Sequence, residues 1–393
     1  MSFSRRRFLE YLAASPAYLA NGAPSGEFIP AKPEEAISLF DFETAARHKL
    51  PPAHFGYIAT GVEDDYTLQA NREAFRHYQL RPRRLVDVTQ TNMRVNIFGR
   101  DWDAPIALAP TGSHKAFHEE GELAVTRAAR SRQTLQILST AATTSVEDVN
   151  TARGEPVWYQ LYPTSSMAVA EKLVKRAESA GCRVLVITVD IPAGRKTDTE
   201  LRYRMLDARD CKTCHAQGAL GTGGYFQRKP MFQGIDMTNQ TLFAPALTWN
   251  AIEKIRKMTS MKVVLKGIVT GEDGALAREA GIDGLIVSNH GGRAEENGRG
   301  TLDCLSEILD SVKGGIPVLI DGGFRRGSDV FKALALGARA ICIGRPYLWG
   351  LAAFGQAGVE AVIDMLRKEL MLVMQQCGTR SLSEISSSHV RRA

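Results

Sequence analysis

Residues 318–345 read VLIDGGFRRGSDVFKALALGARAICIGR, and the fold prediction starts from this stretch. A short apolar run at 318–320 is followed by glycines, by an amphipathic segment at 329–336, and by a second apolar run at 340–343. Runs that are apolar at every position are typical of strands buried on both faces, as in parallel sheets. The stretch therefore predicts a strand–helix–strand unit with parallel strands.

The same unit recurs along the chain. The apolar runs are 105–109, 135–138, 157–161, 184–188, 263–266, 284–287, 318–320 and 340–343, and helical stretches between them include 120–131, 167–180, 273–280, 304–312 and 329–336. Eight strands that alternate with helices predict a (β/α)8 TIM barrel. A doubly wound sheet is the competing arrangement, but no GxGxxG motif follows the first run, which disfavours a dinucleotide-binding version.

Composition bounds the class of protein. The chain has 393 residues, 44% hydrophobic and 23% charged, which is ordinary for a globular protein. The net charge is +6, but five arginines at the two ends of the chain (5–7 and 391–392) supply most of it, and no basic stripe carries interleaved aromatics. We therefore expect no nucleic-acid partner. No run of 18 apolar residues exists, so we expect no transmembrane segment.

Residues 1–33 form an N-terminal extension that precedes the predicted barrel domain at 34–393. The sequence RRRFL at 5–9 and the mildly apolar stretch after it resemble a twin-arginine export signal. Glu10, Pro16 and Asn21 interrupt that apolar stretch, so the alternative is a basic N-terminal extension that carries no export signal. An export signal would place the protein in the periplasm, and its absence would leave it in the cytoplasm.

The spacing of strands is broken once, between the fourth and the fifth, where about 75 residues intervene. The excess, about 198–243, is predicted to be a lid over the C-terminal face of the barrel. It contains Cys211, Cys214 and His215 in a CxxCH spacing, which is the attachment signature of c-type haem. A disulfide, half of a zinc site and a polar loop with incidental cysteines remain alternatives, and no metal site is predicted.

Polar residues and glycines follow every predicted strand. In barrel enzymes the functional residues lie just past the C-terminal ends of the strands. The residues in these positions are Pro110, Thr111 and Gly112, then Ser139, Gln160 and Tyr162, Thr188 and Asp190, Lys266, Ser288 to Arg293, Asp321 to Arg326, and Gly344 with Arg345. Because all eight strand ends meet at one face, we expect a single site there.

The last two strand ends predict a phosphate site. Glycines such as Gly323 and Gly344 let backbone N–H groups approach an anion, and Arg325 or Arg345 adds bidentate charge. Phosphate sites after strands 7 and 8 recur in such barrels. We expect one member of the pair Arg325 and Arg326 to lie in a solvated loop instead.

His290 is the candidate general base, because an imidazole titrates near neutral pH. Asp190 would orient the ring and stabilise its protonated form. Arg293 lies three residues beyond His290, where it suits a carboxylate-bearing substrate. Lys266 would place a positive charge where a reduced cofactor develops a negative one.

These residues resemble those of the FMN-dependent α-hydroxy acid oxidases and dehydrogenases, a family that includes glycolate oxidase, lactate oxidase and mandelate dehydrogenase. The resemblance covers about residues 38–390. The matching segments are 57–64 (YIATGVED), 109–112 (APTG), 159–162 (YQLY), 264–267 (VLKG), 287–293 (VSNHGGR), 320–327 (IDGGFRRG), 343–346 (IGRP) and 380–385 (RSLSEI). The SNHGxR block at 288–293 and the DGGxRRG block at 321–327 are together highly specific.

The resemblance implies a role for each matched residue. His290 would take a proton from the substrate with Asp190 behind it, and Lys266 would support the reduced flavin. The residues implied to hold the substrate are Tyr57, Tyr162, Arg195 and Arg293. Those implied to hold FMN are Pro110, Thr111, Gly112, Ser139, Gln160, Thr188, Lys266, Ser288, Asp321, Gly322, Gly323, Arg325, Gly344 and Arg345.

Three departures from the family pattern qualify these expectations. The segment that normally carries the second substrate arginine is one residue shorter, so Arg195 is the best candidate and Lys196 an alternative. Gly112 stands where oxygen-using oxidases tend to have alanine and dehydrogenase-type relatives have glycine. Ala141 replaces the bulky aromatic of glycolate oxidase, which predicts a roomier pocket than glycolate requires.

The sequence thus predicts FMN-dependent oxidation of an L-2-hydroxy acid, lactate-like or larger, to the 2-oxo acid. The electron acceptor would be oxygen, a quinone or a cytochrome, with oxygen expected to react slowly. The resemblance implies a homo-oligomer, specifically a tetramer. The alternatives are a cytochrome-linked variant with haem on the CxxCH lid and a non-catalytic FMN-binding barrel.

Overall fold

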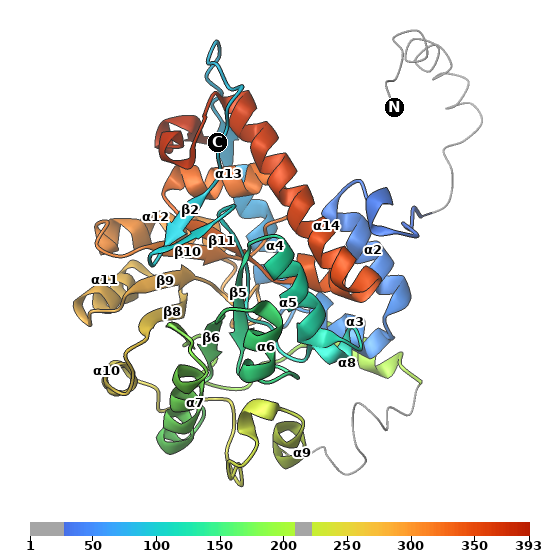
Figure 1. The fold of residues 1–393 in the computed structure, drawn as a ribbon, viewed down its shortest axis with the longest axis vertical. Helices are drawn as coiled ribbons and strands as arrows, with labels where there is room; N and C mark the ends of the chain where they lie inside the picture. Colours follow the sequence, from blue (N-terminus) through green and yellow to red (C-terminus); the bar gives the residue numbers. More distant parts are fainter. Residues whose placement is uncertain (1–26, 209–221) are drawn as a thin grey trace.

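A computed structural model describes residues 27–208 and 222–393 of the chain (Figure 1). The arginine-rich start of the N-terminal extension and the CxxCH segment lie outside these residues.

The centre of the molecule is a closed barrel of parallel strands, which confirms the predicted (β/α)8 fold. The order β10-β11-β4-β5-β6-β7-β8-β9 closes because β11 pairs with β4, for example Ile341 with Ile106, and this closure excludes a doubly wound sheet. Each strand coincides with a predicted apolar run: β4 (Ile106–Leu108), β5 (Leu135–Ser139), β6 (Trp158–Leu161), β7 (Val184–Thr188), β8 (Lys262–Ile268), β9 (Gly284–Val287), β10 (Val318–Asp321) and β11 (Ala340–Ile343).

Alternate residues of each strand pack on opposite faces, and both faces are buried. In β7, Val184 and Val186 belong to the apolar cluster that fills the barrel, whereas Leu185 and Ile187 belong to the larger cluster beneath the helices. This two-sided burial explains why the strands are continuously apolar in sequence.

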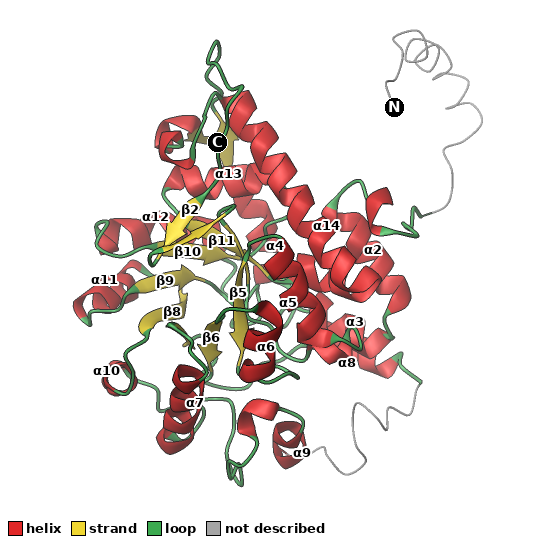
Figure 2. Ribbon diagram, in the orientation of Figure 1, coloured by secondary structure: helices red, strands yellow, loops and turns green. Residues whose placement is uncertain are grey.

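Helices form a ring around the strands (Figure 2). They are α5 (Gly121–Ser131), α6 (Val146–Arg153), α7 (Met167–Ser179), α10 (Trp249–Lys257), α11 (Gly271–Glu279), α12 (Thr301–Val312), α13 (Gly327–Leu336) and α14 (Arg345–Cys377). The long α14 is kinked at Phe354 and Gly355, where the backbone leaves helical geometry. It packs against α2 (Leu39–Lys49) and α5.

Further elements lie outside the barrel strands and the ring of helices, among them a β-hairpin that was not predicted from the sequence. They are α3 (Pro52–Ala59), α4 (Tyr66–Glu73) and the β2 (Val95–Ile97)–β3 (Arg100–Trp102) hairpin, with short 3-10 helices at Pro33–Glu35, Ala74–His77 and His114–Ala116. Val95, Ile97 and Trp102 join the cluster inside the barrel, so the hairpin plugs the barrel opposite the site. Strand β1 (Tyr78–Leu80) pairs antiparallel with β12 (Val390–Arg392), beyond the 3-10 helices Leu382–Glu384 and Ser387–His389.

The predicted lid contains α8 (Asp198–Met205), α9 (Thr222–Gln227) and the 3-10 helix Pro230–Phe232 within its described parts.

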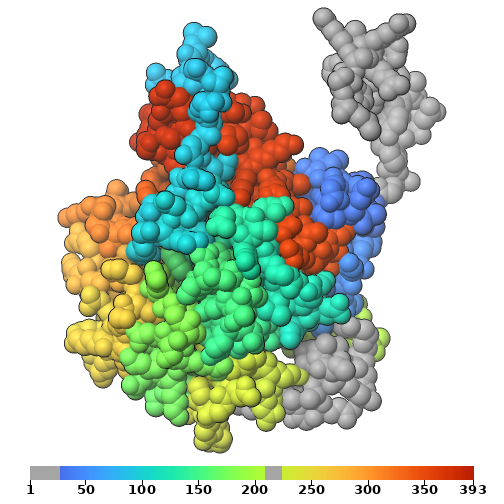
Figure 3. Space-filling model, in the orientation of Figure 1, coloured from blue at the N-terminus to red at the C-terminus, as the bar shows by residue number. Residues whose placement is uncertain are grey.

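Figure 3 shows the light-blue segment after β1 projecting at the upper end of the molecule, beside the C-terminal helix. Within residues 27–208 and 222–393, no helix is long and apolar enough to cross a membrane.

The burial of α14 can be tested with two leucines of the same helix. Leu366 is 0% exposed and Leu372 is 48% exposed. Leu366→Ala should lower the free energy of unfolding by about 2–5 kcal/mol, because it removes buried methyl groups and leaves a cavity. Leu372→Ala should change it by less than about 0.5 kcal/mol. Chemical denaturation of the two variants measures the difference, and equal losses would contradict this packing of α14.

Candidate active site

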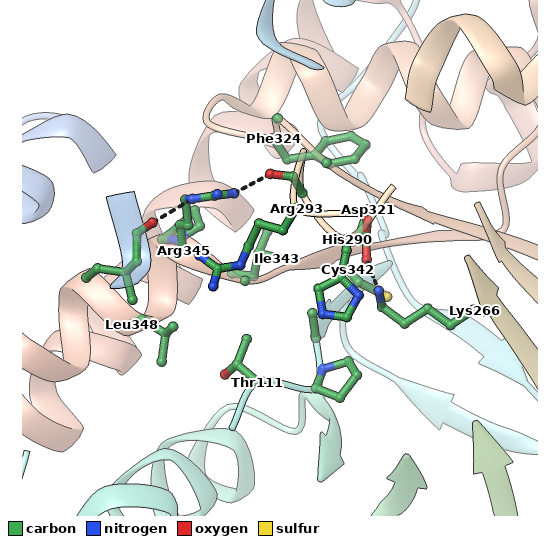
Figure 4. A pocket seen from close by; sticks show the side chains of 18 of the residues that line it. Thr111, Lys266, His290, Arg293, Asp321, Phe324, Cys342, Ile343, Arg345 and Leu348 are labelled. Carbon is green, nitrogen blue, oxygen red and sulfur yellow. Dashed lines mark hydrogen bonds and ion pairs between the residues drawn. The ribbon is translucent and has the colours of Figure 1, made fainter. Parts of the chain in front are cut away.

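A cavity lies at the C-terminal rim of the barrel, with about 800 Å³ of space not filled by atoms, part of which is open to solvent. Most of the residues expected at the site line this cavity: Tyr57, Pro110, Thr111, Gly112, Tyr162, Lys266, His290, Arg293, Asp321, Gly322, Gly323, Arg325, Gly344 and Arg345. Figure 4 shows the side chains of Lys266, His290, Arg293 and Arg345 around the space beside Thr111.

Four residues expected to touch the cofactor do not line the cavity but lie buried at the strand ends around it. Ser139 Oγ donates to Gln160 Oε1 at 2.9 Å, and Gln160 Nε2 donates to Thr188 Oγ1 at 2.9 Å. The fourth, Ser288, accepts a hydrogen bond from Lys266 Nζ at 2.7 Å. These bonds fix the strand-end side chains in place before any ligand binds.

Lys266 carries its positive charge into the cavity at the end of β8. Its Nζ atom lies 3.1 Å from Asp321 Oδ2. Burial lowers the pKa of Lys266, but the carboxylates of Asp321 and Asp190 outweigh burial and hold this pKa above its usual value. Asp321 Oδ1 is buried without a hydrogen-bond partner among the described residues, so it can accept a hydrogen bond from a ligand hydroxyl.

His290 and Asp190 form a dyad across two strand ends. His290 Nδ1 lies 2.8 Å from Asp190 Oδ1, and His290 Nε2 lies 3.4 Å from the Tyr162 hydroxyl. Burial lowers the pKa of His290, and the attraction of Asp190 only partly opposes it. Burial alone would raise the pKa of Asp190, but the charges of His290 and Lys266 hold it below its usual value. The ring is therefore neutral at pH 7 and presents Nε2 as a proton acceptor.

Three arginines bring buried positive charge to the cavity. Burial lowers the pKa of Arg345 to about 9, with repulsion from Arg293 and Arg325 added. Burial likewise lowers the pKa of Arg325 to about 10, although Glu43 opposes the shift. Within the described residues no carboxylate forms an ion pair with these three guanidinium groups. The cavity is consequently suited to anionic groups such as phosphate and carboxylate.

The glycines beside these arginines permit close approach of backbone. Gly322 and Gly323 have φ of +100° and +81°, and a side chain on Gly323 would collide with the carbonyl of Asn71. Arg325 lies over the Trp349 ring, 4.5 Å from its centroid. Arg326 is the exposed member of the arginine pair and bonds Glu369 at 3.1 Å.

Arg345 also has a structural task that the sequence did not indicate. Its guanidinium donates to the carbonyls of Ile58 at 2.7 Å, Thr60 at 2.8 Å and Gly291 at 2.8 Å. It thereby ties the segment after α3 to the loop that carries His290.

Of the four residues expected to hold the substrate, Tyr57, Tyr162 and Arg293 line the cavity, whereas Arg195 lies behind Arg293 and does not line it. The Arg293 guanidinium lies 4.6 Å from the centroid of the Tyr57 ring, and Arg195 Nη1 donates to the Arg293 carbonyl at 3.0 Å. Lys196 is 70% exposed and bonds Asp198 instead, so the geometry favours Arg195 over Lys196. Tyr225 of α9, absent from the sequence-based set, lies close enough that Tyr57 and Tyr162 add to the rise that burial causes in its pKa.

A buried polar cluster behind Thr111 was also not foreseen. His114 Nε2 lies 2.7 Å from Thr111 Oγ1, and Glu122 accepts the backbone N–H of Thr143 at 2.7 Å. Lys229, only 4% exposed, reaches from the lid to donate to Ser113. The cluster links the lid to the loop that follows β4. A buried histidine, glutamate and lysine far apart in sequence carry no pattern that could have marked it.

Comparisons with known proteins show which family the chain belongs to. The chain matches the family model "FMN-dependent dehydrogenase" over residues 46–392. It is 41% identical over 354 residues to a peroxisomal (S)-2-hydroxy-acid oxidase of Oryza sativa subsp. japonica, covering 90% of this chain and 95% of that protein. A 2-hydroxyacid oxidase of Dictyostelium discoideum is 39% identical over 355 residues, with 90% and 89% covered.

Solved structures of similar proteins share the fold. A mandelate oxidase superposes with a TM-score of 0.79 at 37% identity, covering 91% of this chain and 98% of that one. A variant of an active chimera of (S)-mandelate dehydrogenase gives a TM-score of 0.81 at 30% identity, covering 91% and 99%.

The cavity fits FMN by its own features. It offers buried arginines and glycines for a phosphate, the unpartnered Asp321 Oδ1 for a hydroxyl, and the charged Lys266 for a reduced flavin ring. With nearly the whole chain matched as well, this protein belongs to the family of FMN-dependent dehydrogenases.

Proposed function

We propose that the protein oxidises an L-2-hydroxy acid to the 2-oxo acid, with His290 as the base. The observation that carries the proposal is the pairing of a neutral His290 imidazole with the Asp190 carboxylate, since His290 shares one cavity with Arg293 and Lys266. The substrate must lose two protons and two electrons in total, and FMN, when bound, would accept the two electrons together with one of the protons. His290 Nε2 takes one proton from the substrate, while Asp190 stabilises the imidazolium that results.

Arg293 and Arg195 hold the substrate carboxylate in this proposal, with Tyr57 and Tyr162 beside its hydroxyl. Both arginines are anchored through backbone carbonyls rather than carboxylates, so their charge is available to a ligand. Arg325 and Arg345, with Gly323 and Gly344, hold the FMN phosphate at the ends of β10 and β11.

The side chain of the substrate is larger than that of glycolate. Gly112 and Ala141 face each other, since a methyl group on Gly112 would lie 2.9 Å from Ala141 Cβ. Ala141 stands where glycolate oxidase carries a bulky aromatic residue, and this smaller side chain supports a lactate-like or aromatic substrate. Relatives named mandelate oxidase and (S)-mandelate dehydrogenase support a 2-hydroxy acid larger than glycolate as the substrate.

The proposal extends to a homotetramer and to a quinone or cytochrome as electron acceptor, with oxygen reacting slowly. Export through the arginine-rich extension at 1–33 would suit a respiratory acceptor. Size-exclusion chromatography with light scattering measures the molar mass of the oligomer. Cell fractionation shows whether the protein is present in the periplasmic fraction.

The experiment that tests the activity supplies L-mandelate, L-lactate and glycolate to purified holoenzyme with a dye as acceptor and measures the 2-oxo acid formed. We expect L-mandelate or L-lactate to be oxidised in preference to glycolate, and the D enantiomers to be inert. Absence of a 2-oxo acid from every substrate would leave the non-catalytic FMN-binding barrel as the correct reading.

His290→Gln should retain FMN and reduce flavin reduction by roughly 10⁴-fold, because general-base catalysis and support of developing charge are both lost. Stopped-flow absorbance under anaerobic conditions measures the rate. Near wild-type reduction would remove His290 from the mechanism.

The pH profile tests the dyad. Because burial holds the pKa of His290 below its usual value near 6.5, kcat/KM should stay high at pH 7 and fall only as the pH drops below about 6.5 and the base becomes protonated. Asp190→Asn removes the attraction that opposes burial, so this acid limb should move to still lower pH while the plateau falls. An acid limb that stays in place in Asp190→Asn would contradict the pairing.

Two neighbouring arginines provide a matched test of the phosphate site. Arg325→Met should weaken FMN binding by about 2 kcal/mol, or roughly 30-fold in Kd, which is the loss expected for a charge-assisted hydrogen bond. Arg326→Met should leave Kd unchanged because Arg326 bonds Glu369 at the surface. Fluorescence titration of apoprotein with FMN measures both, and the reverse ranking would place the phosphate elsewhere.

Gly112 allows a test of the acceptor. Gly112→Ala alone would press its methyl group against Ala141, so the double variant with Ala141→Gly makes room for it. We expect reoxidation by oxygen to rise in the double variant, while substrate affinity changes less. Wild-type reoxidation in air as fast as turnover with a dye would show instead that the enzyme is an oxidase.

A further inference from the structure

A buried pair of asparagines joins α4 to the loop that carries His290. The pair is Asn71 of α4 and Asn289, each 1% exposed. Asn71 Nδ2 donates to Asn289 Oδ1 at 2.9 Å, and Asn289 Nδ2 donates to Asn71 Oδ1 at 3.0 Å. The two residues are 218 positions apart, so this reciprocal bond is a long-range tie between the N-terminal segment and the barrel.

Asn289 organises the base loop, which we define as residues 289–293. Its Oδ1 atom also accepts the backbone N–H of Gly292 at 2.9 Å, and its carbonyl accepts the N–H of Arg293 at 3.1 Å. Within this loop His290 adopts φ of +57°, a left-handed conformation that costs free energy for a residue with a side chain. The surrounding hydrogen bonds must therefore hold the loop in this shape.

Asn71 faces the phosphate loop, residues 321–325, on its other side. A side chain on Gly322 would lie 3.0 Å from Asn71 Oδ1, and one on Gly323 would collide with the Asn71 carbonyl. Asn71 Oδ1 also accepts the N–H of Thr301 at 3.0 Å, and the Thr301 hydroxyl donates to the Asp321 carbonyl at 2.5 Å. The Asn71 side chain thus bonds the base loop directly and is linked to the phosphate loop through Thr301.

We propose that Asn71 is a positioning residue that sets the base loop relative to the phosphate loop, and hence His290 relative to the cofactor. The claim that Asn71 positions His290 for catalysis rests on the proposed function. The claim that Asn71 positions the phosphate loop rests on FMN binding alone. Removal of the Asn71 amide takes the acceptor from the Thr301 N–H and one of two partners from each polar atom of the Asn289 amide, which keeps only its bonds to Gly292 and Arg299. The two loops then lose their direct tie and can shift relative to each other.

The first test measures flavin reduction at saturating L-mandelate or L-lactate, whichever reacts faster. Asn71→Ala should lower the reduction rate constant by about 100-fold, as expected for a displaced catalytic group, with less than about threefold change in substrate Kd. Asn289→Ala should act similarly, and the double variant should be no slower than the slower single variant. Gln69→Ala, on the exposed face of the same helix, is the control and should match wild type.

The isosteric variant Asn71→Asp separates positioning from general loss of structure. Its carboxylate keeps the acceptor oxygens but cannot donate to Asn289 Oδ1, whereas the protonated carboxyl group can donate once more. Burial raises the pKa of such a carboxyl group, so the ratio of variant to wild-type rates should rise as the pH falls. A ratio independent of pH, or additive effects of Asn71→Ala and Asn289→Ala, would overturn the proposal.

FMN affinity provides a readout that needs no substrate. Asn71→Ala should raise the Kd for FMN by about tenfold, the effect of one lost interaction, while Gln69→Ala should leave it unchanged. If wild type oxidises no 2-hydroxy acid, the activity proposal fails, and this titration still decides the role of Asn71. Wild-type FMN affinity in Asn71→Ala would overturn it.

Discussion

The site depends on buried positive charge that the protein leaves without carboxylate partners. Barrel closure brings Arg293, Arg325 and Arg345 to one rim, where burial lowers the pKa values of Arg325 and Arg345 and repulsion from Arg293 and Arg325 adds to the shift of Arg345. Backbone carbonyls, such as those of Thr60 and Gly291, satisfy the N–H groups without neutralising the charge. An anionic ligand is the natural complement to this arrangement, because it restores charge balance in a place that water cannot fully solvate.

The same cavity keeps its two other basic groups in different protonation states. Asp321 and Asp190 raise the pKa of Lys266 more than burial lowers it, so Lys266 remains charged. Asp190 raises the pKa of His290 less than burial lowers it, so His290 remains neutral. One carboxylate therefore serves two purposes, stabilising an ammonium group and orienting an imidazole. This separation of pKa values gives a proton acceptor and a fixed positive charge within one site.

The sequence predicted the barrel and most of the residues that line its cavity. Each strand is marked by a local apolar run, and the functional residues directly follow these runs in the sequence. The apolar runs matched β4 to β11, and the glycine–arginine segments after β10 and β11 fell at the cavity. Contacts between distant segments left no local pattern. Neither the Asn71–Asn289 pair nor the Lys229–Ser113 bond could be predicted, since each depends on where the folded chain brings two polar residues together. Thr67 lies in the mostly polar segment 63–70 and is nevertheless buried, with its hydroxyl accepting the N–H of Gly298.

The most direct test of the central claim compares FMN with riboflavin, which lacks only the phosphate. Equilibrium titration of apoprotein, followed by flavin fluorescence, should give a Kd for FMN at least about 100-fold lower than that for riboflavin, since two buried arginines each contribute a charge-assisted hydrogen bond. Added salt should narrow the difference little, because buried charges are poorly screened. Equal affinities for the two flavins would show that the buried arginines serve another purpose and would contradict this account.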